Sequence, residues 1–185
     1  MTRQLLLRKA LALFDEKGYA STTVDDIAAA ADTTRTTFYA HFPSKAHLMQ
    51  SLIQEANNIL TSTDSPPLPA VVRSGERKEI KAWLARKFDQ WAAIRPYVIA
   101  GHQAAAVDPD IQAALDRWFD ETVEEMQQGL DQAGRFDPAT RRDRCLLAFG
   151  GLEFLSRRWM RLGWDTDGEQ ALDLLTDTWC HLLAE

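Results

Sequence analysis

Hydroxyl, guanidinium and imidazole side chains are concentrated between residues 34 and 41 of this 185-residue chain. Thr34 has the form of a helix N-cap, and Phe38 and Phe42 then lie four positions apart on one face of the helix that follows. The other face exposes Arg35, Thr36, Thr37, Tyr39 and His41. The dipole and free N–H groups of a helix N-terminus favour phosphate, and Arg or Thr can reach the edges of bases. These residue types at this spacing indicate contact with a nucleic acid.

A second short helix is predicted just before this segment. Thr23 and Asp26 have the spacing of a capping box, and apolar residues at 27, 28 and 31 place one face inward over two turns. A polar turn at residues 32–33 separates the two helices, and Pro43 ends the second one. The pair predicts a helix-turn-helix, whose second helix enters the major groove. The spacing alone fits a second interpretation equally well. In it, these residues form a small helical subdomain whose Thr and Arg side chains are solvated helix caps.

Three stretches of the N-terminal region resemble the signature of TetR-type (TetR/AcrR) transcriptional regulators. They are ALFDEKGY at residues 12–19, TTVDDIA at residues 22–28 and TFYAHFPSK at residues 37–45. The match runs over about residues 5–52, and order, spacing and residue type agree across three helices. The rest of the chain resembles the family only in the number and length of its helices.

The resemblance implies a role for each polar residue of this head. The residues expected to hold phosphates are Thr23, Tyr39, His41 and Lys45. The candidate base readers at the start of the recognition helix are Thr34, Arg35, Thr36 and Thr37. The family usually has glycine where this chain has Asp32, and Asp adopts a left-handed backbone more readily than most residues. The family also often has glycine at the place of Thr36 and a larger residue at that of Ala40. The differences at Thr36 and Ala40 are expected to change which operator sequence is recognised.

Charge is distributed unevenly along the chain, whose net charge is -6. Residues 1–48 hold six Lys or Arg against five Asp or Glu, and the remainder holds fifteen against twenty-two. A nearly neutral head on an acidic body is compatible with phosphate binding, because binding depends on the local electrostatic potential and not on the net charge of the whole chain.

Other classes of protein are disfavoured by composition. An apolar content of 45% is that of an ordinary globular protein, and the apolar stretches are too short to span a membrane. Cys145 and Cys180 form neither a disulfide framework nor a zinc site. No catalytic arrangement, phosphate-binding glycine loop or metal-spaced cluster is visible, so neither an enzyme nor a cofactor is expected. The N-terminus lacks the pattern of a signal peptide, which predicts a cytoplasmic protein.

Helical periodicity recurs along the whole chain, and strand signals are scarce. Breaks at residues 62–69, 107–109, 134–138 and 163–168 predict an all-α fold of about nine helices, with three short ones before residue 43. Pro96 is expected to break another helix. We expect a helix-turn-helix DNA-binding domain over residues 1–48 and a helical ligand-binding and dimerisation domain over residues 49–185.

A homodimer is expected because one recognition helix buries too little surface for specific binding. Dimers read two half-sites about one helical turn apart, which predicts a palindromic double-stranded DNA operator. Residues 146–155 are apolar in too many directions for one intramolecular face. The family pairs its last two helices in the dimer, which supports an interface there. A helix buried entirely within its own domain is the alternative.

All six tryptophans lie after residue 82, in the predicted body. Apolar pockets with a few polar groups are typical of ligand sites, although such side chains are more often plain core. The candidate ligand-binding residues are Trp83, Phe88, Trp91, His102, Trp118, Phe119, Met126 and Phe149. Glu153 is expected to pair with Arg157 four residues later. The combined prediction is a repressor released from its operator by an unknown small apolar or amphipathic ligand. The alternative is a helical dimeric protein-interaction module without a ligand response.

Overall fold

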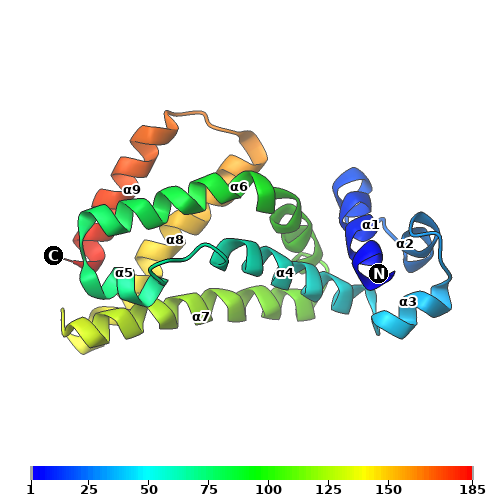
Figure 1. Cartoon of the computed structure of the whole chain (residues 1–185), viewed down its shortest axis with the longest axis horizontal. Coiled ribbons are helices and arrows are strands. Elements are labelled where there is room, and N and C mark those ends of the chain that lie inside the picture. The colour runs from blue at the N-terminus through cyan, green and yellow to red at the C-terminus, as the bar shows by residue number, and fades with distance from the viewer. Residues whose placement is uncertain (1, 185) are drawn as a thin grey trace. The chain divides into compact units, whose positions relative to one another are not determined.

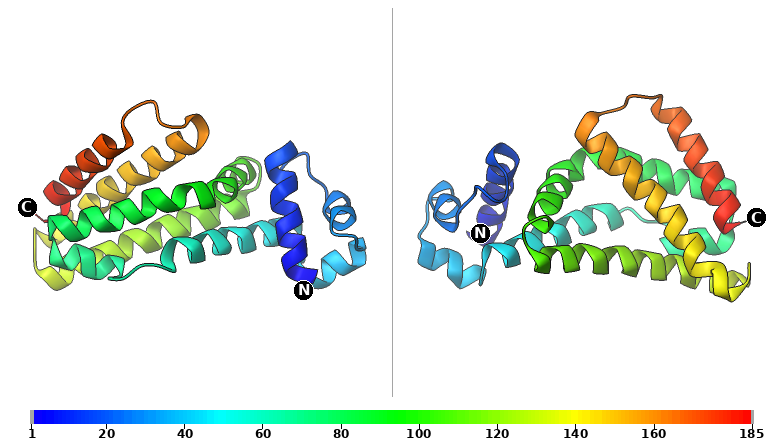
Figure 2. Two further views of the ribbon diagram at one scale, coloured as in Figure 1. Left: turned by 45° about the horizontal axis from the view of Figure 1, so that its top comes forward. Right: turned by 180° about the vertical axis from the view of Figure 1, so that it is seen from behind.

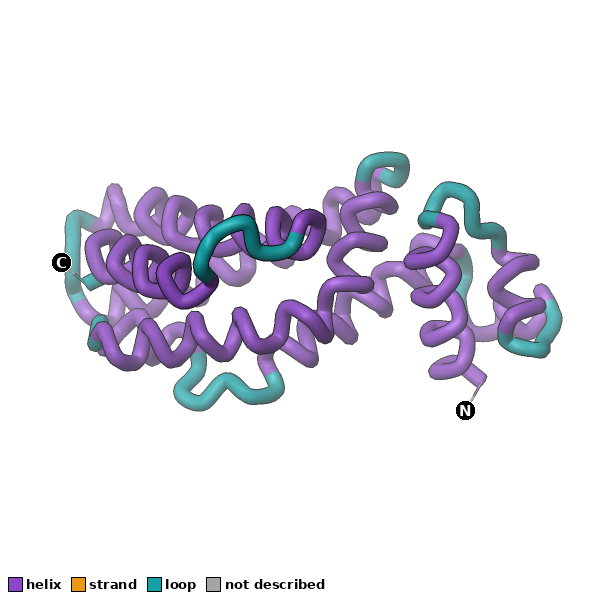
Figure 3. The backbone as a smooth tube through the Cα atoms, turned by 90° about the horizontal axis from the view of Figure 1, so that it is seen from above, coloured by secondary structure: helices purple, strands orange, loops and turns teal. Residues whose placement is uncertain are grey.

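The computed structural model describes residues 2–184, and within them every regular element is a helix (Figures 1 and 3). The nine helices confirm the predicted all-α class. They are α1 (Thr2–Lys17), α2 (Val24–Ala30), α3 (Arg35–His41), α4 (Lys45–Thr61), α5 (Leu68–Ser74), α6 (Arg77–Ala105), α7 (Pro109–Ala133), α8 (Pro138–Leu162) and α9 (Gly168–Leu183). None of the helices in this range is long and apolar enough to cross a lipid bilayer.

The expected breaks are confirmed, with two corrections. The helix α1 has 16 residues and is therefore not short. The helix α6 continues through Pro96, where a break was expected. Proline removes one backbone hydrogen bond and disfavours a helix interior. Continuation of the helix nevertheless lets Ala100 and Ala104 reach a buried apolar cluster, and this burial compensates for the lost bond.

The chain forms two compact units, each built from two segments that are separated in the sequence. The first contains the segment up to Ile59 together with Ala93–Arg117. The second contains Leu60–Ala92 together with the segment from Trp118 onward. The expected functional division into residues 1–48 and 49–185 stays a prediction, because units of packing and units of function need not coincide.

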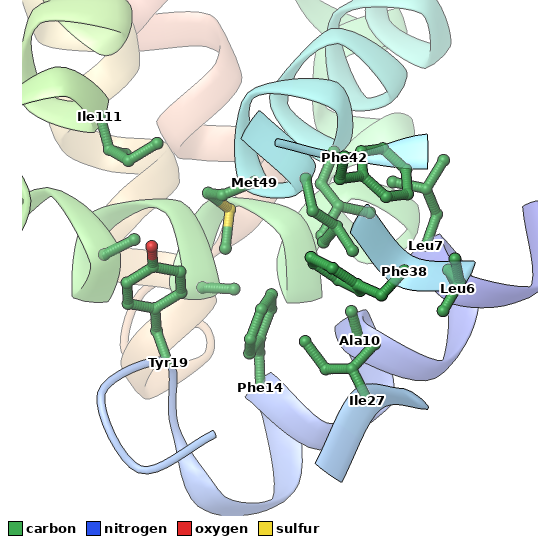
Figure 4. Close-up of a cluster of buried hydrophobic side chains, with 14 of the residues drawn as sticks. Leu6, Leu7, Ala10, Phe14, Tyr19, Ile27, Phe38, Phe42, Met49 and Ile111 are labelled. Atoms are coloured by element: carbon green, nitrogen blue, oxygen red, sulfur yellow. The ribbon is translucent and has the colours of Figure 1, made fainter. Parts of the chain in front are cut away.

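The first unit is organised around one apolar cluster that holds the short helices in place. Figure 4 shows the side chains of α1, α2, α3 and α4 meeting there, with Ile111 of α7. Phe14, Ile27 and Phe38 are each almost fully buried in it. A helix of seven residues has little stability by itself in water, so α2 and α3 depend on this burial.

The second unit contains the antiparallel pair of α8 and α9, joined by the loop after Leu162 (Figure 2). Trp179 of α9 is fully buried, and its indole N–H donates to the carbonyl of Ala148 at 2.9 Å. Gly129 of α7 allows a close approach of α5, because a Cβ atom there would lie 2.6 Å from the carbonyl oxygen of Pro69.

Candidate nucleic-acid interface

The helix α2 begins with the predicted capping box. The backbone N–H of Asp26 donates to the Thr23 hydroxyl at 3.1 Å, and the backbone N–H of Thr23 donates to the Asp26 carboxylate at 2.8 Å. The ammonium of Lys17 also lies 2.8 Å from that carboxylate. Hydrogen bonds from Lys17 and Thr23 lower the pKa of Asp26, so its carboxylate stays charged and the cap stays formed. The start of α2 is thereby fixed by local bonds.

The turn between the two helices has the backbone that the sequence predicted. Asp32 has a φ of 50°, in the left-handed region that the family usually fills with glycine. The backbone N–H of Thr33 bonds the Ala28 carbonyl at 3.0 Å, which closes the turn. Aspartate at this position is therefore compatible with a helix-turn-helix.

The helix α3 presents its polar face to solvent while its apolar face is buried. Thr34 is the N-cap, and its hydroxyl accepts from the backbone N–H of Thr37 at 3.1 Å. Phe38 has no exposed surface, whereas Arg35 and Thr36 in the first turn are exposed. Tyr39 and His41 are also exposed. The candidate base readers and phosphate contacts of α3 thus lie on one short, well-anchored helix.

Arg35 is held by two neighbours that orient its side chain. Its Nη1 atom lies 3.1 Å from a carboxylate oxygen of Asp25 on α2, and its Nη2 atom donates to the Tyr39 hydroxyl at 3.3 Å. The Tyr39 hydrogen bond and the charge of Asp25 raise the pKa of Arg35. The guanidinium also lies over the Tyr39 ring, 5.5 Å from its centroid. Sequence reasoning missed Asp25, although its place in the TTVDDIA stretch was a signal.

Lys45 makes contacts that were not expected. Its ammonium donates to the backbone carbonyls of Tyr19 and Thr22, each at 2.8 Å, and lies 4.1 Å from the centroid of the Tyr19 ring. Burial lowers the pKa of Lys45. Of its three N–H donors, one remains for a phosphate. Phosphate contact by Lys45 therefore stays a prediction, beside an observed role in holding the turn between α1 and α2.

Tyr19 connects this turn to α6 and α7 within the first unit. Its backbone N–H donates to the side chain of Gln103 at 3.3 Å, and its hydroxyl lies 3.5 Å from a carboxylate oxygen of Asp108. Burial and the Asp108 charge raise the pKa of Tyr19 to about 12, so the phenol stays protonated at neutral pH. Sequence reasoning did not identify Tyr19 as a connecting residue, although it lies in one of the quoted stretches.

Comparison with known proteins agrees with this geometry. Residues 6–52, which contain most of α1, all of α2 and α3 and the start of α4, match the family described as bacterial regulatory proteins, tetR family. A TetR-like transcriptional regulator from Rhodococcus sp. RHA1 has a similar fold over 100% of this chain and 97% of its own, at 19% identity and a TM-score of 0.70. The chain belongs to the TetR family.

Curated relatives of this TetR-family chain are named as regulators and repressors. The probable acrEF/envCD operon repressor of Escherichia coli K12 is 43% identical over 114 residues, which are 62% of this chain and 45% of that one. The repressor DhaR of Mycobacterium sp. is 39% identical over 66 residues, 36% of this chain and 33% of its own length. The matches span only 27% to 65% of the length of curated relatives such as these.

The candidate ligand residues of this TetR-family chain fall into separate groups. Trp118, Phe119 and Phe149 are in ring contact, with Phe149 4.9 Å from Phe119 and 5.6 Å from Trp118. Phe88 stacks on Trp91 at 4.1 Å. Both groups belong to the second unit. The ring of Trp91 also contacts those of Trp159 and Trp164, two tryptophans outside the predicted set of ligand contacts.

The other three candidates differ in their surroundings. Trp83 is 3% exposed and stacks on Trp179 with centroids 5.4 Å apart, and Met126 is fully buried. His102 belongs to the first unit. Glu153 bonds Arg157 at 2.8 Å, which confirms that expected pair. A role of these residues in ligand binding stays a prediction.

Proposed function

We propose that this chain is a sequence-specific DNA-binding transcriptional repressor whose recognition helix is α3. The supporting observation is the arrangement of α3, a seven-residue helix that is anchored by Phe38 and exposes Arg35 and Thr36 in its first turn. Side chains in the first turn of a recognition helix reach base edges in the major groove. Tyr39 and His41 are exposed beside it and supply hydrogen-bond donors for phosphates. Thr23 is exposed too, but its hydroxyl donates to the Asp26 carboxylate at 2.7 Å, so its contact with a phosphate requires that bond to be exchanged.

The repressor acts as a homodimer through α8 and α9. Leu147 and Phe154 of α8 and Leu174 of α9 are 66%, 63% and 62% exposed. Leu147, Gly151 and Phe154 are spaced four and three residues apart, so they lie on one face of α8. Large apolar side chains gathered on one face are typical of a protein–protein interface. The small residue between them permits close crossing by a second copy.

A small ligand bound in the second unit lowers the affinity for the operator. Support comes from α4, a single helix that begins at Lys45 and whose last turn is bonded to α6. The ammonium of Lys87 donates to the carbonyl of Leu60 and to the carboxylate of Asp64, the latter at 2.6 Å. A ligand that displaces α6 therefore acts on the same helix that carries Lys45. The coupling requires two states between which the ligand discriminates.

Selection of bound DNA from a random pool tests the DNA-binding part of this proposal. The expected result is one enriched inverted repeat with half-sites about one helical turn apart. The double variant Arg35→Ala/Thr36→Ala should enrich no sequence while its thermal unfolding remains that of the wild type. A pool without enrichment by the wild-type protein contradicts the proposal and favours the protein-interaction module.

A further inference from the structure

The interior of the second unit contains a fork of hydrogen-bond donors without an acceptor. Nε and Nη2 of Arg86 on α6 are buried, and within residues 2–184 neither has a hydrogen-bond partner. The indole N–H of Trp83, three residues earlier on α6, is likewise buried and unbonded in the described part of the chain. Residues three apart on a helix share a face, so these donors face the same region.

The geometry of the free atoms specifies the group that fits them. Nε–H and one Nη–H of a guanidinium are parallel donors, and a carboxylate accepts from both at once. Buried donors left without an acceptor are rare in native proteins, and an unpaired buried charge is costly. An acceptor with two oxygens and a negative charge would remove both penalties together.

Two carboxylates of the second unit are already bonded to cations. The carboxylate of Asp64 bonds the buried ammonium of Lys87, and that of Glu153 bonds Arg157 at 2.8 Å. A third carboxylate, that of Glu125, has its pKa raised by burial and by the charge of Asp64. The charge of Arg86 contributes to lowering the pKa of Lys87, after burial as the larger cause, so the two cations lie close together. Arg86 is half-buried, and its positive charge has no acceptor at Nε and Nη2 among the described residues. That charge favours an anion over a neutral ligand.

We propose that the effector of this regulator is a small amphipathic carboxylic acid whose carboxylate is bound side-on by Arg86 and by the indole N–H of Trp83. The apolar body of the acid lies against the aromatic side chains of the second unit, of which Trp83 is one. This inference rests on the proposed ligand response and specifies the chemistry of its ligand.

The test uses two acids and their neutral amides of nearly the same shape, namely decanoate with decanamide and 2-naphthoate with 2-naphthamide. Thermal unfolding and intrinsic tryptophan fluorescence are recorded with the full-length protein. At least one acid should raise Tm and bind at least about tenfold more tightly than its amide, as expected for charge-assisted hydrogen bonds. Equal binding of acid and amide, or no binding by either acid, overturns the proposal.

Three variants assign the preference to the proposed atoms. Arg86→Met should abolish the acid preference, and Trp83→Phe should weaken acid binding about fivefold while keeping the aromatic ring. Lys78→Met, at an exposed position of α6, removes the same charge and should preserve the preference. Persistence of the preference in Arg86→Met overturns the proposal.

Stability without added acid separates a ligand-binding arginine from a structural one. Because Nε and Nη2 of Arg86 lack acceptors, Arg86→Met should unfold at the same temperature as the wild type or higher. A lower Tm contradicts the proposal, since it would reveal a stabilising partner of the guanidinium. Operator binding by each preparation is measured without acid. If the wild-type protein does not bind an operator, the proposed function is overturned. If it binds an operator but shows no preference for the acid, this inference alone is overturned.

Discussion

The guanidinium of Arg35 is oriented by Asp25 and Tyr39 on an exposed surface. This ion pair contributes little to stability, because its side chains are 60% and 66% exposed and water screens the attraction. Its importance lies in the orientation that it gives to the Arg35 guanidinium. A guanidinium held at the start of α3 loses less conformational freedom on binding a base edge than a freely rotating one.

At the residue scale, the first prediction concerns base reading. Arg35→Ala and Thr36→Ala should each cost about 1–3 kcal/mol on the selected operator and much less on random DNA. Fluorescence anisotropy titrations with both kinds of DNA measure the difference. Lys78→Ala, an exposed change on α6, serves as the control and should leave both affinities unchanged. Equal losses on both DNAs would make Arg35 and Thr36 phosphate contacts.

A second prediction at this scale separates the two roles of Lys45. Lys45→Ala leaves two backbone carbonyls without their donor, so the free energy of unfolding should fall by about 1–2 kcal/mol. If its third N–H contacts a phosphate, the salt dependence of DNA affinity should also flatten by up to about one unit of slope. Urea denaturation and titrations at several salt concentrations give the two quantities. An unchanged unfolding free energy would contradict the structural role.

At the scale of elements, α6 carries both a buried ion pair and buried unbonded donors of the second unit. Lys87, which is 5% exposed, bonds the end of α4 and the loop after it, while its neighbour Arg86 is unbonded at two atoms. The ammonium of Lys87 also lies 4.6 Å from the centroid of the Trp83 ring. One face of one helix thus bears both the proposed ligand contacts and the bond to α4. A ligand at Arg86 acts next to that bond.

The prediction for this element concerns the buried ion pair. Lys87→Met leaves the carboxylate of Asp64 nearly buried without its partner, so the free energy of unfolding should fall by about 3–5 kcal/mol. The double variant Lys87→Met/Asp64→Leu removes both charges and should recover most of that loss. Urea denaturation of the two variants and the wild type measures it. A double variant no more stable than the single one would show that the pair matters for reasons other than charge.

At the scale of the whole molecule, the proposed DNA binding depends on assembly of two copies. A single head contacts one half-site, and affinity for a palindrome requires two heads at a fixed spacing. Apolar side chains exposed on α8 and α9 form the surface by which we propose that two copies associate. The proposed regulation also belongs to this scale, because a ligand acts by changing the spacing of two heads.

The prediction for the assembly uses a charge placed on that surface. Phe154→Glu should give a folded monomer, since Phe154 is 63% exposed and contributes little to the core. Its operator affinity should fall at least about tenfold, because only one half-site is then held at a time. Val107→Glu changes another exposed apolar residue, in the turn between α6 and α7, and should remain dimeric. Sedimentation and circular dichroism measure mass and folding, and a dimeric Phe154→Glu would place the interface elsewhere.

The local features of the head could be predicted from the sequence because they depend on residues only a few positions apart. The capping box of Thr23 and Asp26, the left-handed Asp32 and the Thr34 cap are each made by groups within one or two helical turns. Hydrogen bonds at such spacing are set by residue type and backbone geometry, whatever the rest of the chain does. The same holds for the i,i+4 pair of Glu153 and Arg157.

Only the tertiary structure decided which partners distant residues meet. The ammonium of Lys45 bonds carbonyls more than twenty residues earlier, and the helix continues through Pro96 where its sequence predicted a break. The Nε and Nη2 donors of Arg86 are buried and unbonded because of the segments that pack around them. Helical periodicity assigns a residue to a face of its own helix. What covers that face depends on segments far away in the chain, and burial and charge compensation are determined there.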